Sequence, residues 1–197
     1  MNHARTMPAP CMSPIQITTP RLLLHIPPAQ DAHLLAAFDD TNRRHLAPWE
    51  PVRELAWYAP ESYEKRQQQA LDHFSAGTAL HLVLHDKASG QMVGKCSYTN
   101  IVRGPFLACN LGYSLGAAWQ GQGLMLEALK ATNNYVFNEL GLHRIMAAYM
   151  PLNERSGRLL KRLGFEREGL ARSYLCIAGQ WEDHVLTSLI NPATPRS

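Results

Sequence analysis

A glycine-rich segment ahead of a helix-like stretch is the first feature of the sequence that could do chemistry. Its residues are Trp119, Gln120, Gly121, Gln122, Gly123, Leu124 and Met125. Glycine lets backbone amides approach a ligand closely, and the first turn of a helix presents unpaired N–H groups and the positive end of its dipole. We therefore expect a phosphate here, although a loop that needs glycine only to begin a helix has the same pattern. No Gly-Lys-Ser/Thr and no third glycine follow, which excludes a P-loop and a dinucleotide fingerprint.

A second group of residues opens a short helical segment further along the chain. Asn153 is well placed as an N-cap. Ser156 shares one helical face with Leu159, Leu160 and Leu163, at positions i, i+3, i+4 and i+7. A serine on that face points its hydroxyl inward, where it needs a hydrogen-bond partner or a ligand. A core serine and a ligand-binding serine both remain open at this point.

Together with other segments in a fixed order, these residues make the sequence resemble the GNAT acetyltransferases. Within that family it resembles the RimJ/RimL group of ribosomal-protein N-terminal acetyltransferases, and most of all the RimJ branch. The resemblance covers about residues 15–192. Each segment alone is weakly diagnostic, but their order and spacing together are highly specific. The segments are 19–22, 48–53, 100–104, 111–114, 119–125, 143–147, 153–157, 163–165 and 179–185.

The resemblance implies acetyl-CoA as co-substrate, lying in a gap of the sheet. Backbone groups of 113–115 would pair with the pantetheine arm as an extra strand would, 120–125 would hold the pyrophosphate, and Asn153 would bind the arm with Ser156 near the sulfur. The implied cofactor contacts are Tyr113, Ser114, Leu115, Gln120, Gly121, Gln122, Gly123, Leu124, Met125, Asn153 and Ser156.

Two positions depart from the family pattern. The last position of the glycine-rich loop is usually glycine or alanine and is Met125 here, a change that a backbone contact tolerates. The common tyrosine of the short helix is replaced by Leu160, so the usual phenolic acid is missing. Ser156 is then the best candidate to donate a hydrogen bond to the leaving thiolate.

The acceptor amine sets a further requirement. A protein α-amino group has a pKa of about 7.7–8, whereas a lysine side chain, near 10.4, is roughly 2.5 units harder to deprotonate. An N-terminal amine therefore needs only a modest base, and the sequence shows no unambiguous one. A backbone N–H near Leu111 or Gly112 could stabilise the oxyanion.

Five residues are expected on the acceptor side. Glu50 and Asp183 could position a water or hold the incoming ammonium, although a surface carboxylate and a strand ion pair are equally simple explanations. Trp49 could wall the acceptor slot or merely pack in its loop, and Tyr98 and Asn100 are expected to contact the acceptor. No metal is expected, because His81 and His85 would lie roughly 13 Å apart along a strand.

These residues need a single α/β domain to position them. The expected GNAT fold has a mixed, mostly antiparallel central sheet, splayed between its fourth and fifth strands, with helices on both faces. Residues 15–192 form the domain, and 1–14 and 193–197 are expected as flexible tails. Strands are expected at 21–26, 79–85, 92–100, 108–115, 144–149, 166–177 and 181–189, and helices at 29–39, 60–74, 121–138 and 154–163, with a loop around 45–51.

Bulk properties fit this description. The chain of 197 residues is 46% hydrophobic, 18% charged and carries a net charge of +3. Its four cysteines lack a C-x-x-C pair, which is typical of reduced cytosolic thiols. No apolar run reaches the roughly 20 residues that span a bilayer, and no secretory signal is evident. A basic helix face, formed by Arg155, Arg158, Lys161 and Arg162, is either solvated or contacts the CoA 3′-phosphate or ribosomal RNA.

The resemblance to the RimJ/RimL group implies a cytoplasmic enzyme that acetylates the N-terminal alanine of the fifth small-subunit ribosomal protein. Its partners would be that protein and possibly the small ribosomal subunit, with no DNA and no membrane. A small-molecule amine or antibiotic acetyltransferase is one alternative. A non-catalytic module that binds the ribosome or assists its assembly is another.

Overall fold

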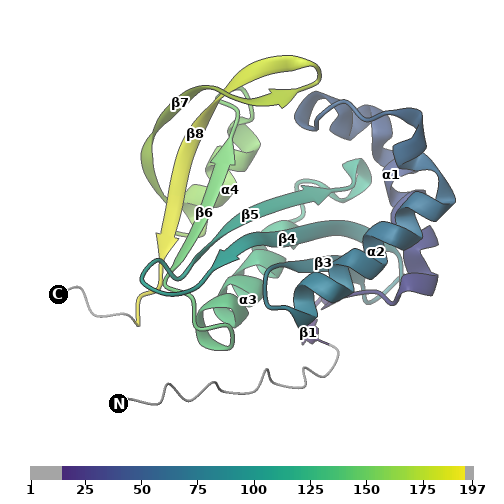
Figure 1. Cartoon of the computed structure of the whole chain (residues 1–197), viewed down its shortest axis with the longest axis horizontal. Helices are drawn as coiled ribbons and strands as arrows, with labels where there is room; N and C mark the ends of the chain where they lie inside the picture. The colour runs from purple at the N-terminus through teal and green to yellow at the C-terminus, as the bar shows by residue number, and fades with distance from the viewer. Residues whose placement is uncertain (1–14, 194–197) are drawn as a thin grey trace, which may run out of the picture.

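The computed structural model describes residues 15–193, so the predicted tails lie outside the described residues except for Ala193. Within them the chain forms one eight-stranded sheet of order β1-β2-β3-β4-β5-β6-β8-β7. The β5–β6 pair is parallel and every other neighbouring pair is antiparallel. The expected mixed, mostly antiparallel sheet is confirmed (Figure 1).

The elements follow the order that the sequence patterns predict. The strands are β1 (Gln16–Thr18), β2 (Leu22–His25), β3 (Leu80–Asp86), β4 (Met92–Val102), β5 (Ala108–Leu115), β6 (Arg144–Tyr149), β7 (Glu166–Ile177) and β8 (Gln180–Ile190). The helices are α1 (Ala32–Leu46), α2 (Pro60–Ser75), α3 (Leu124–Asn138) and α4 (Glu154–Arg162).

Three differences from the expected elements have local causes. The short strand β1 is missing from the sequence prediction, because three residues carry little periodicity. Helix α1 continues to Leu46, so His45 lies in a helix rather than in the expected loop. Helix α3 begins at Leu124 instead of residue 121, because Gly121 and Gly123 have φ values of 74° and 75°, outside the helical region.

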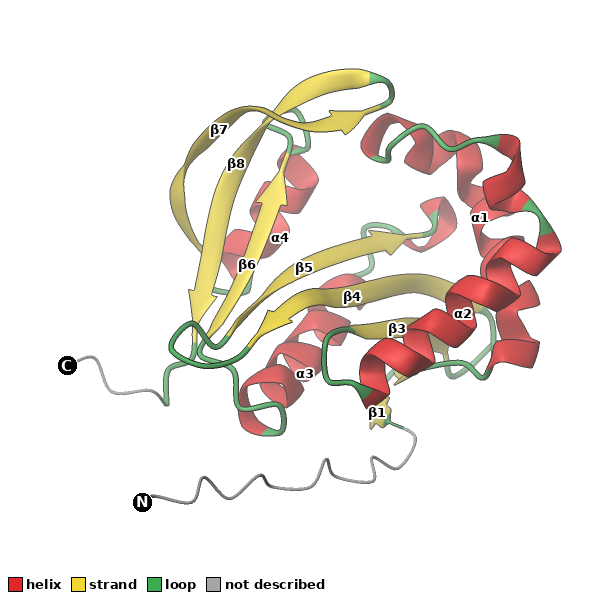
Figure 2. Ribbon diagram, viewed as in Figure 1, coloured by secondary structure: helices red, strands yellow, loops and turns green. Residues whose placement is uncertain are grey.

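Helices cover both faces of the sheet, as expected (Figure 2). Side chains alternate along a strand, so Lys95 and Tyr98 of β4 point to opposite faces and show which helices cover each face. Lys95 forms an ion pair with Asp39 of α1, whereas Tyr98 hydrogen-bonds Thr132 of α3. Helices α1 and α2 therefore cover one face, and α3 covers the other together with α4.

The sheet opens between β5 and β6, the fourth and fifth of the expected strands. Only three residue pairs join these strands, from Ala108↔Arg144 to Asn110↔Met146. Beyond Asn110, β6 continues beside β8 while β5 continues beside β4, and Figure 1 shows the two strands diverging. From Leu111 onward, one edge of β5 therefore has no partner among the strands that the structure describes.

A buried core holds this open sheet in shape. It is concentrated between α3 and β2–β5, where Leu22, Leu80, Leu82 and Leu129 are almost fully buried. On the other arm, Leu160 of α4 belongs to the same core cluster. Burying side chains of this size stabilises the fold by about 1.5–3 kcal/mol each. Among the described helices, none is long and apolar enough to cross a membrane.

Candidate active site

The glycine-rich loop presents backbone amides at the start of α3. Gly123 is the N-cap of this helix in the left-handed conformation, and no side chain of the described residues caps the helix. The N–H groups of the first turn lack partners within the helix and carry the positive end of its dipole. At Gly121 an added Cβ would meet nothing within 4 Å, so its backbone borders open space. This geometry suits an anionic ligand.

The loop is held by residues far away in the sequence. Glu127, in the first turn of α3, accepts hydrogen bonds from Thr19 Oγ1 at 2.6 Å, Arg21 N at 2.9 Å and Arg21 Nε at 2.7 Å. Arg21 Nη1 also donates to the carbonyl of Gln122 at 2.8 Å. Although partial burial opposes ionisation, these donors hold the pKa of Glu127 below its usual value. The segment at 19–22 thus fixes the loop, a role that the sequence did not reveal.

Gln120 links the glycine-rich loop to two helices. Its amide donates to Nε2 of His45 on α1 at 2.9 Å, and its carbonyl oxygen accepts from the Arg155 guanidinium of α4. Arg155 therefore has a defined partner, whereas Arg158 forms an exposed i,i+4 ion pair with Glu154. The glycine-rich loop and α4 are consequently linked across the mouth of the gap.

The start of α4 holds a hydroxyl pair. Asn153 caps the helix, its Oδ1 accepting from Ser156 N at 3.1 Å, which leaves its amide nitrogen available. Ser156 Oγ lies 2.6 Å from the phenolic oxygen of Tyr113. Burial raises the pKa of Tyr113 to about 12. Leu160, at the position of the family's common tyrosine, is buried in the core. The phenol beside Ser156 comes instead from Tyr113 of β5.

The free edge of β5 can be assigned residue by residue. Gly116 N donates to Val93 O, so even-numbered residues of this stretch direct their backbone groups toward β4. Odd-numbered residues direct theirs into the gap, namely Leu111, Tyr113 and Leu115. Ser114 is paired through its backbone with Lys95. The prediction that the backbone of Ser114 binds the cofactor is therefore corrected.

A cleft of about 930 Å³ lies on the face of β5 that α1 and α2 cover, between the sheet and these two helices. Its floor includes Ser97 and Gly112, and Glu50 contributes to its wall. The β7–β8 hairpin borders the cleft as well: Ala178 and Gly179 turn with φ of 48° and 83°, as a two-residue hairpin turn requires. Ala178 N donates to the carbonyl of Glu50 at 3.0 Å.

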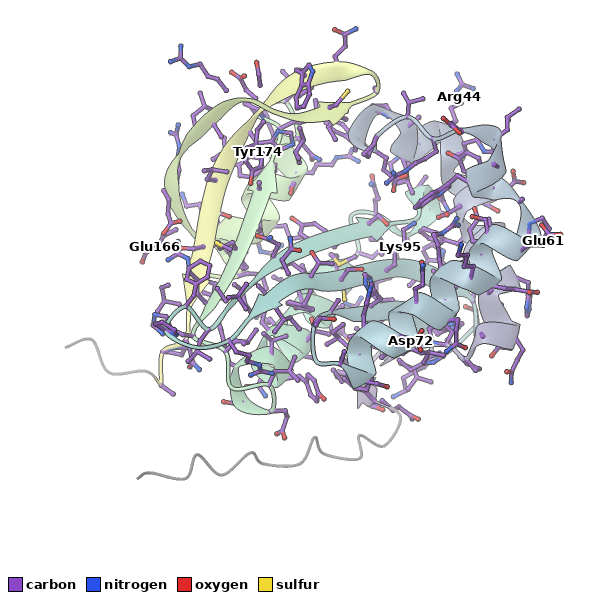
Figure 3. The ribbon with its side chains drawn as sticks, viewed as in Figure 1. Arg44, Glu61, Asp72, Lys95, Glu166 and Tyr174 are labelled. Atoms are coloured by element: carbon purple, nitrogen blue, oxygen red, sulfur yellow. The ribbon has the colours of Figure 1, made fainter. Side chains whose placement is uncertain are left out.

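Two carboxylates line this cleft and differ in their surroundings. Asp39 is paired with Lys95 Nζ at 2.7 Å and accepts from the Tyr63 hydroxyl at 3.1 Å. Burial, with the Asp39 charge beside it, raises the pKa of Tyr63 to about 12. The Glu50 carboxylate has no hydrogen bond or ion pair with the described residues. Figure 3 shows Lys95 on the face of β4 that α1 and α2 cover.

Known proteins are similar to this chain in sequence. Residues 21–166 match the family described as acetyltransferase (GNAT) domain, which is well over half of the chain. The chain belongs to the GNAT acetyltransferase family. It is 46% identical over 178 residues to the [Ribosomal protein uS5]-alanine N-acetyltransferase of Escherichia coli (strain K12), covering 90% of this chain and 92% of that protein.

Solved structures of similar proteins agree in fold. The ribosomal-protein-S5-alanine acetyltransferase from Vibrio fischeri has a TM-score of 0.87 and 41% identity, covering 92% of this chain and all of that one. Mycobacterium smegmatis RimJ in complex with CoA-disulfide has a TM-score of 0.85 and 26% identity, covering 93% and 91% of the two chains.

Two predicted acceptor residues of this GNAT acetyltransferase lie elsewhere. Tyr98 is fully buried, its hydroxyl bonded to Thr132 and Asn133 on the α3 face, so it cannot touch an acceptor in the cleft. Asn100 lies at an irregularity of the β4–β5 pairing with φ of 51°, a backbone conformation that asparagine tolerates. Asn100 does not line the cleft. The prediction for Tyr98 is corrected, and that for Asn100 stays a prediction.

Asp183 and Trp49 also lie outside the set of residues that line the cleft. Asp183 Oδ1 accepts from Ser173 N at 2.8 Å, stabilising the irregular stretch of β7 where Ser173 has φ of 47°. It does not line the cleft, and its partner is a backbone amide rather than the cation of an ion pair. Trp49 is 38% exposed in a 3₁₀ turn and does not line the cleft either. Of the predicted acceptor residues, Glu50 alone lies there.

Proposed function

We propose that this GNAT acetyltransferase transfers the acetyl group of acetyl-CoA to the N-terminal α-amine of a ribosomal protein, the alanine at the start of protein uS5. The similarity to the Escherichia coli enzyme carries this proposal, because it spans 90% of the chain and so includes the gap, the loop and the cleft. The reaction would take place in the cytosol, where ribosomal proteins are made.

The residues around the gap fit acetyl-CoA. Residues 120–125 would bind the pyrophosphate, and the odd-numbered backbone groups of β5 would pair with the pantetheine amides. The amide nitrogen of Asn153 would bind the same arm. When bound, acetyl-CoA supplies the activated acetyl group as a thioester. Similarity to a RimJ that holds CoA-disulfide supports this placement.

The chain's own groups would then serve each step of the transfer. The N–H of Leu111, directed into the gap, would donate to the thioester oxygen as negative charge develops on it. The hydroxyl of Ser156 would donate to the departing sulfur, and Tyr113 would donate in turn to Ser156. A half-buried pair of this kind would stabilise a thiolate without needing a charged acid.

The acceptor would enter by the cleft on the other face of β5. Its α-ammonium would be attracted by the carboxylate of Glu50. Three arginines stack on aromatic rings along this wall, with Arg66 lying 3.9 Å from the centre of the Trp57 ring and Arg43 lying 4.2 Å from that of Tyr58. Such stacking keeps the guanidinium groups ordered beside the entering peptide.

An intact-mass assay tests the proposal. The enzyme and acetyl-CoA would be incubated with peptides that begin with alanine, peptides that begin with serine, and peptides with a blocked N-terminus and a free lysine. A gain of one acetyl group on the alanine peptide alone is expected. Acetylation of small amines but of no peptide would indicate a small-molecule enzyme. CoA binding without any transfer would indicate a non-catalytic module.

A further inference from the structure

A row of three residues crosses the floor of the acceptor cleft. Ser97 of β4 is the register partner of both His81 on β3 and Gly112 on β5. Residues opposite one another in antiparallel strands direct their side chains to the same face. All three positions line the cleft. The row therefore runs from the strand that borders the gap to an imidazole two strands away.

Within this row, His81 contacts Ser97 directly, and the space above Gly112 is open. His81 Nδ1 lies 2.9 Å from Ser97 Oγ, within hydrogen-bond distance. At Gly112, an added Cβ would meet nothing within 4 Å. An acceptor amine can therefore approach β5 over Gly112, next to the Ser97 hydroxyl and close to the strand edge expected to hold the thioester.

The other polar groups of the cleft leave the role of base unfilled. Asp39 is occupied by Lys95 and Tyr63. Glu50 lies in the cleft wall beside the hairpin turn, which suits it to attract the ammonium as it enters. A group on the floor, beside the attacked carbon, is better placed to receive the proton.

We propose that Ser97 and His81 form a relay that removes a proton from the acceptor ammonium before attack, a role that rests on the proposed function. One N–H⁺ bond of the ammonium breaks and its proton passes to Ser97 Oγ, while the Ser97 hydroxyl proton passes to His81 Nδ1. The freed nitrogen lone pair then forms the C–N bond, and the C–S bond breaks. A second nitrogen proton ends on the CoA thiol, and the imidazolium returns its proton to solvent.

The surroundings keep His81 able to accept this proton. Its pKa is lowered, first by burial and then by the neighbouring imidazole of His73 on α2, so the ring is neutral near pH 7. The rings of His73 and His81 lie 6.4 Å apart. The other titratable groups that line the cleft are Asp39, Arg43, Glu50, Arg53, Tyr58, Tyr63, Arg66, Lys95, Cys96 and Tyr113.

The pH dependence of acetylation distinguishes a relay from a structural role. In the wild type, kcat should stay near its plateau down to the lowered pKa of His81. In His81→Gln, only acceptor that is already neutral can react, and at pH 7 that is about a tenth of an amine with a pKa near 8. We expect a roughly tenfold loss at pH 7 that closes near pH 9. An equal loss at every pH, or no loss, would overturn the relay.

Further variants keep the test decisive if one protein folds poorly. Ser97→Ala should shift the acidic limb of the profile to higher pH as His81→Gln does, and Ser97→Thr, which keeps a hydroxyl, should restore it. His85→Gln is the matched control, because His85 lies on the same strand but outside the cleft. Calorimetry should show that all four variants, including His81→Gln, bind acetyl-CoA with wild-type affinity. Failure of the wild type to acetylate any alanine peptide would instead refute the proposed function.

Discussion

Tyr113 and Ser156 come from separate arms of the sheet and meet at one hydrogen bond of 2.6 Å. With its pKa raised to about 12, the Tyr113 phenol stays protonated across the physiological range, so it has a proton that it can donate to Ser156. Ser156 then has its own proton free for a ligand in the gap. This pair places a phenol near the expected sulfur position even though residue 160 is leucine.

Removing the phenolic hydroxyl should slow transfer without weakening cofactor binding. Tyr113→Phe loses one donor that acts mainly as charge develops on sulfur, which corresponds to about a tenfold fall in kcat. Ser156→Ala should cost about as much or more. Single-turnover rates would measure both, alongside the dissociation constant of acetyl-CoA.

The double variant is the control for this pair. If the two hydroxyls act as one unit, Tyr113→Phe combined with Ser156→Ala should be little slower than Ser156→Ala alone. Fully multiplicative losses would show that each acts independently and would contradict the hydrogen-bonded pathway.

At the scale of elements, the turn between β1 and β2 anchors the start of α3. Thr19 and Arg21 supply three donors to Glu127, and Arg21 also reaches the loop carbonyl of Gln122. Helix α3 has no side-chain cap within the described part of the chain, which leaves its first amides available to a ligand. The anchor therefore holds the loop through Glu127 and Gln122, while the first backbone amides of α3 stay available to a ligand.

Glu127→Gln should lower the free energy of unfolding by about 1–2 kcal/mol at pH 7, because charged hydrogen bonds are lost. The folded-state pKa of Glu127 is depressed, so its stabilisation is present above the unfolded pKa, near 4.3, and disappears as pH falls through the lower folded pKa. Urea unfolding at pH 7 and at about pH 3 would measure this.

The difference between the two proteins should therefore shrink as the pH is lowered. Glu61→Gln, an exposed glutamate in the first turn of α2, provides a matched control with no hydrogen bond among the described residues. A destabilisation by Glu127→Gln that stays constant with pH would rule out the ionised anchor.

For the molecule as a whole, the sheet consists of two arms. Strands β1–β5 form one and β6, β8 and β7 form the other, joined through three residue pairs of β5 and β6. A ligand in the gap would touch β5 on one arm and α4 on the other. Binding there should stabilise the whole fold, because the ligand binds only when both arms are in place.

CoA should therefore raise the melting temperature. At 100 times its dissociation constant it would add about 2.7 kcal/mol, or roughly 5–10 °C for a chain of this size. Differential scanning calorimetry would measure the change. Pantetheine, which lacks the pyrophosphate, should give a much smaller shift at equal concentration. Equal shifts from the two ligands would contradict phosphate binding at the α3 amides.

Features that depend on neighbouring residues could be predicted from the sequence. The strand bounds 108–115, 144–149 and 166–177 match β5, β6 and β7, and Asn153 caps α4 as expected. The glycine-rich loop can be recognised because Gly121 and Gly123 provide a backbone that few other residues adopt. Periodicity, capping and positive φ are all set within a few residues of chain.

Contacts between distant segments were decided only by the tertiary structure. Tyr98 is expected at the acceptor and lies in the core, whereas Ser97, one residue earlier, faces the cleft and meets His81. Side chains alternate along a strand, so the face on which a residue lies depends on pairing register and on which helix packs above it. The contacts of Asp183 with Ser173, Tyr113 with Ser156, and Arg21 with Glu127 also depend on how separate segments pack together. Residue types and spacing determined which groups were available, and strand register together with helix packing determined which of them meet.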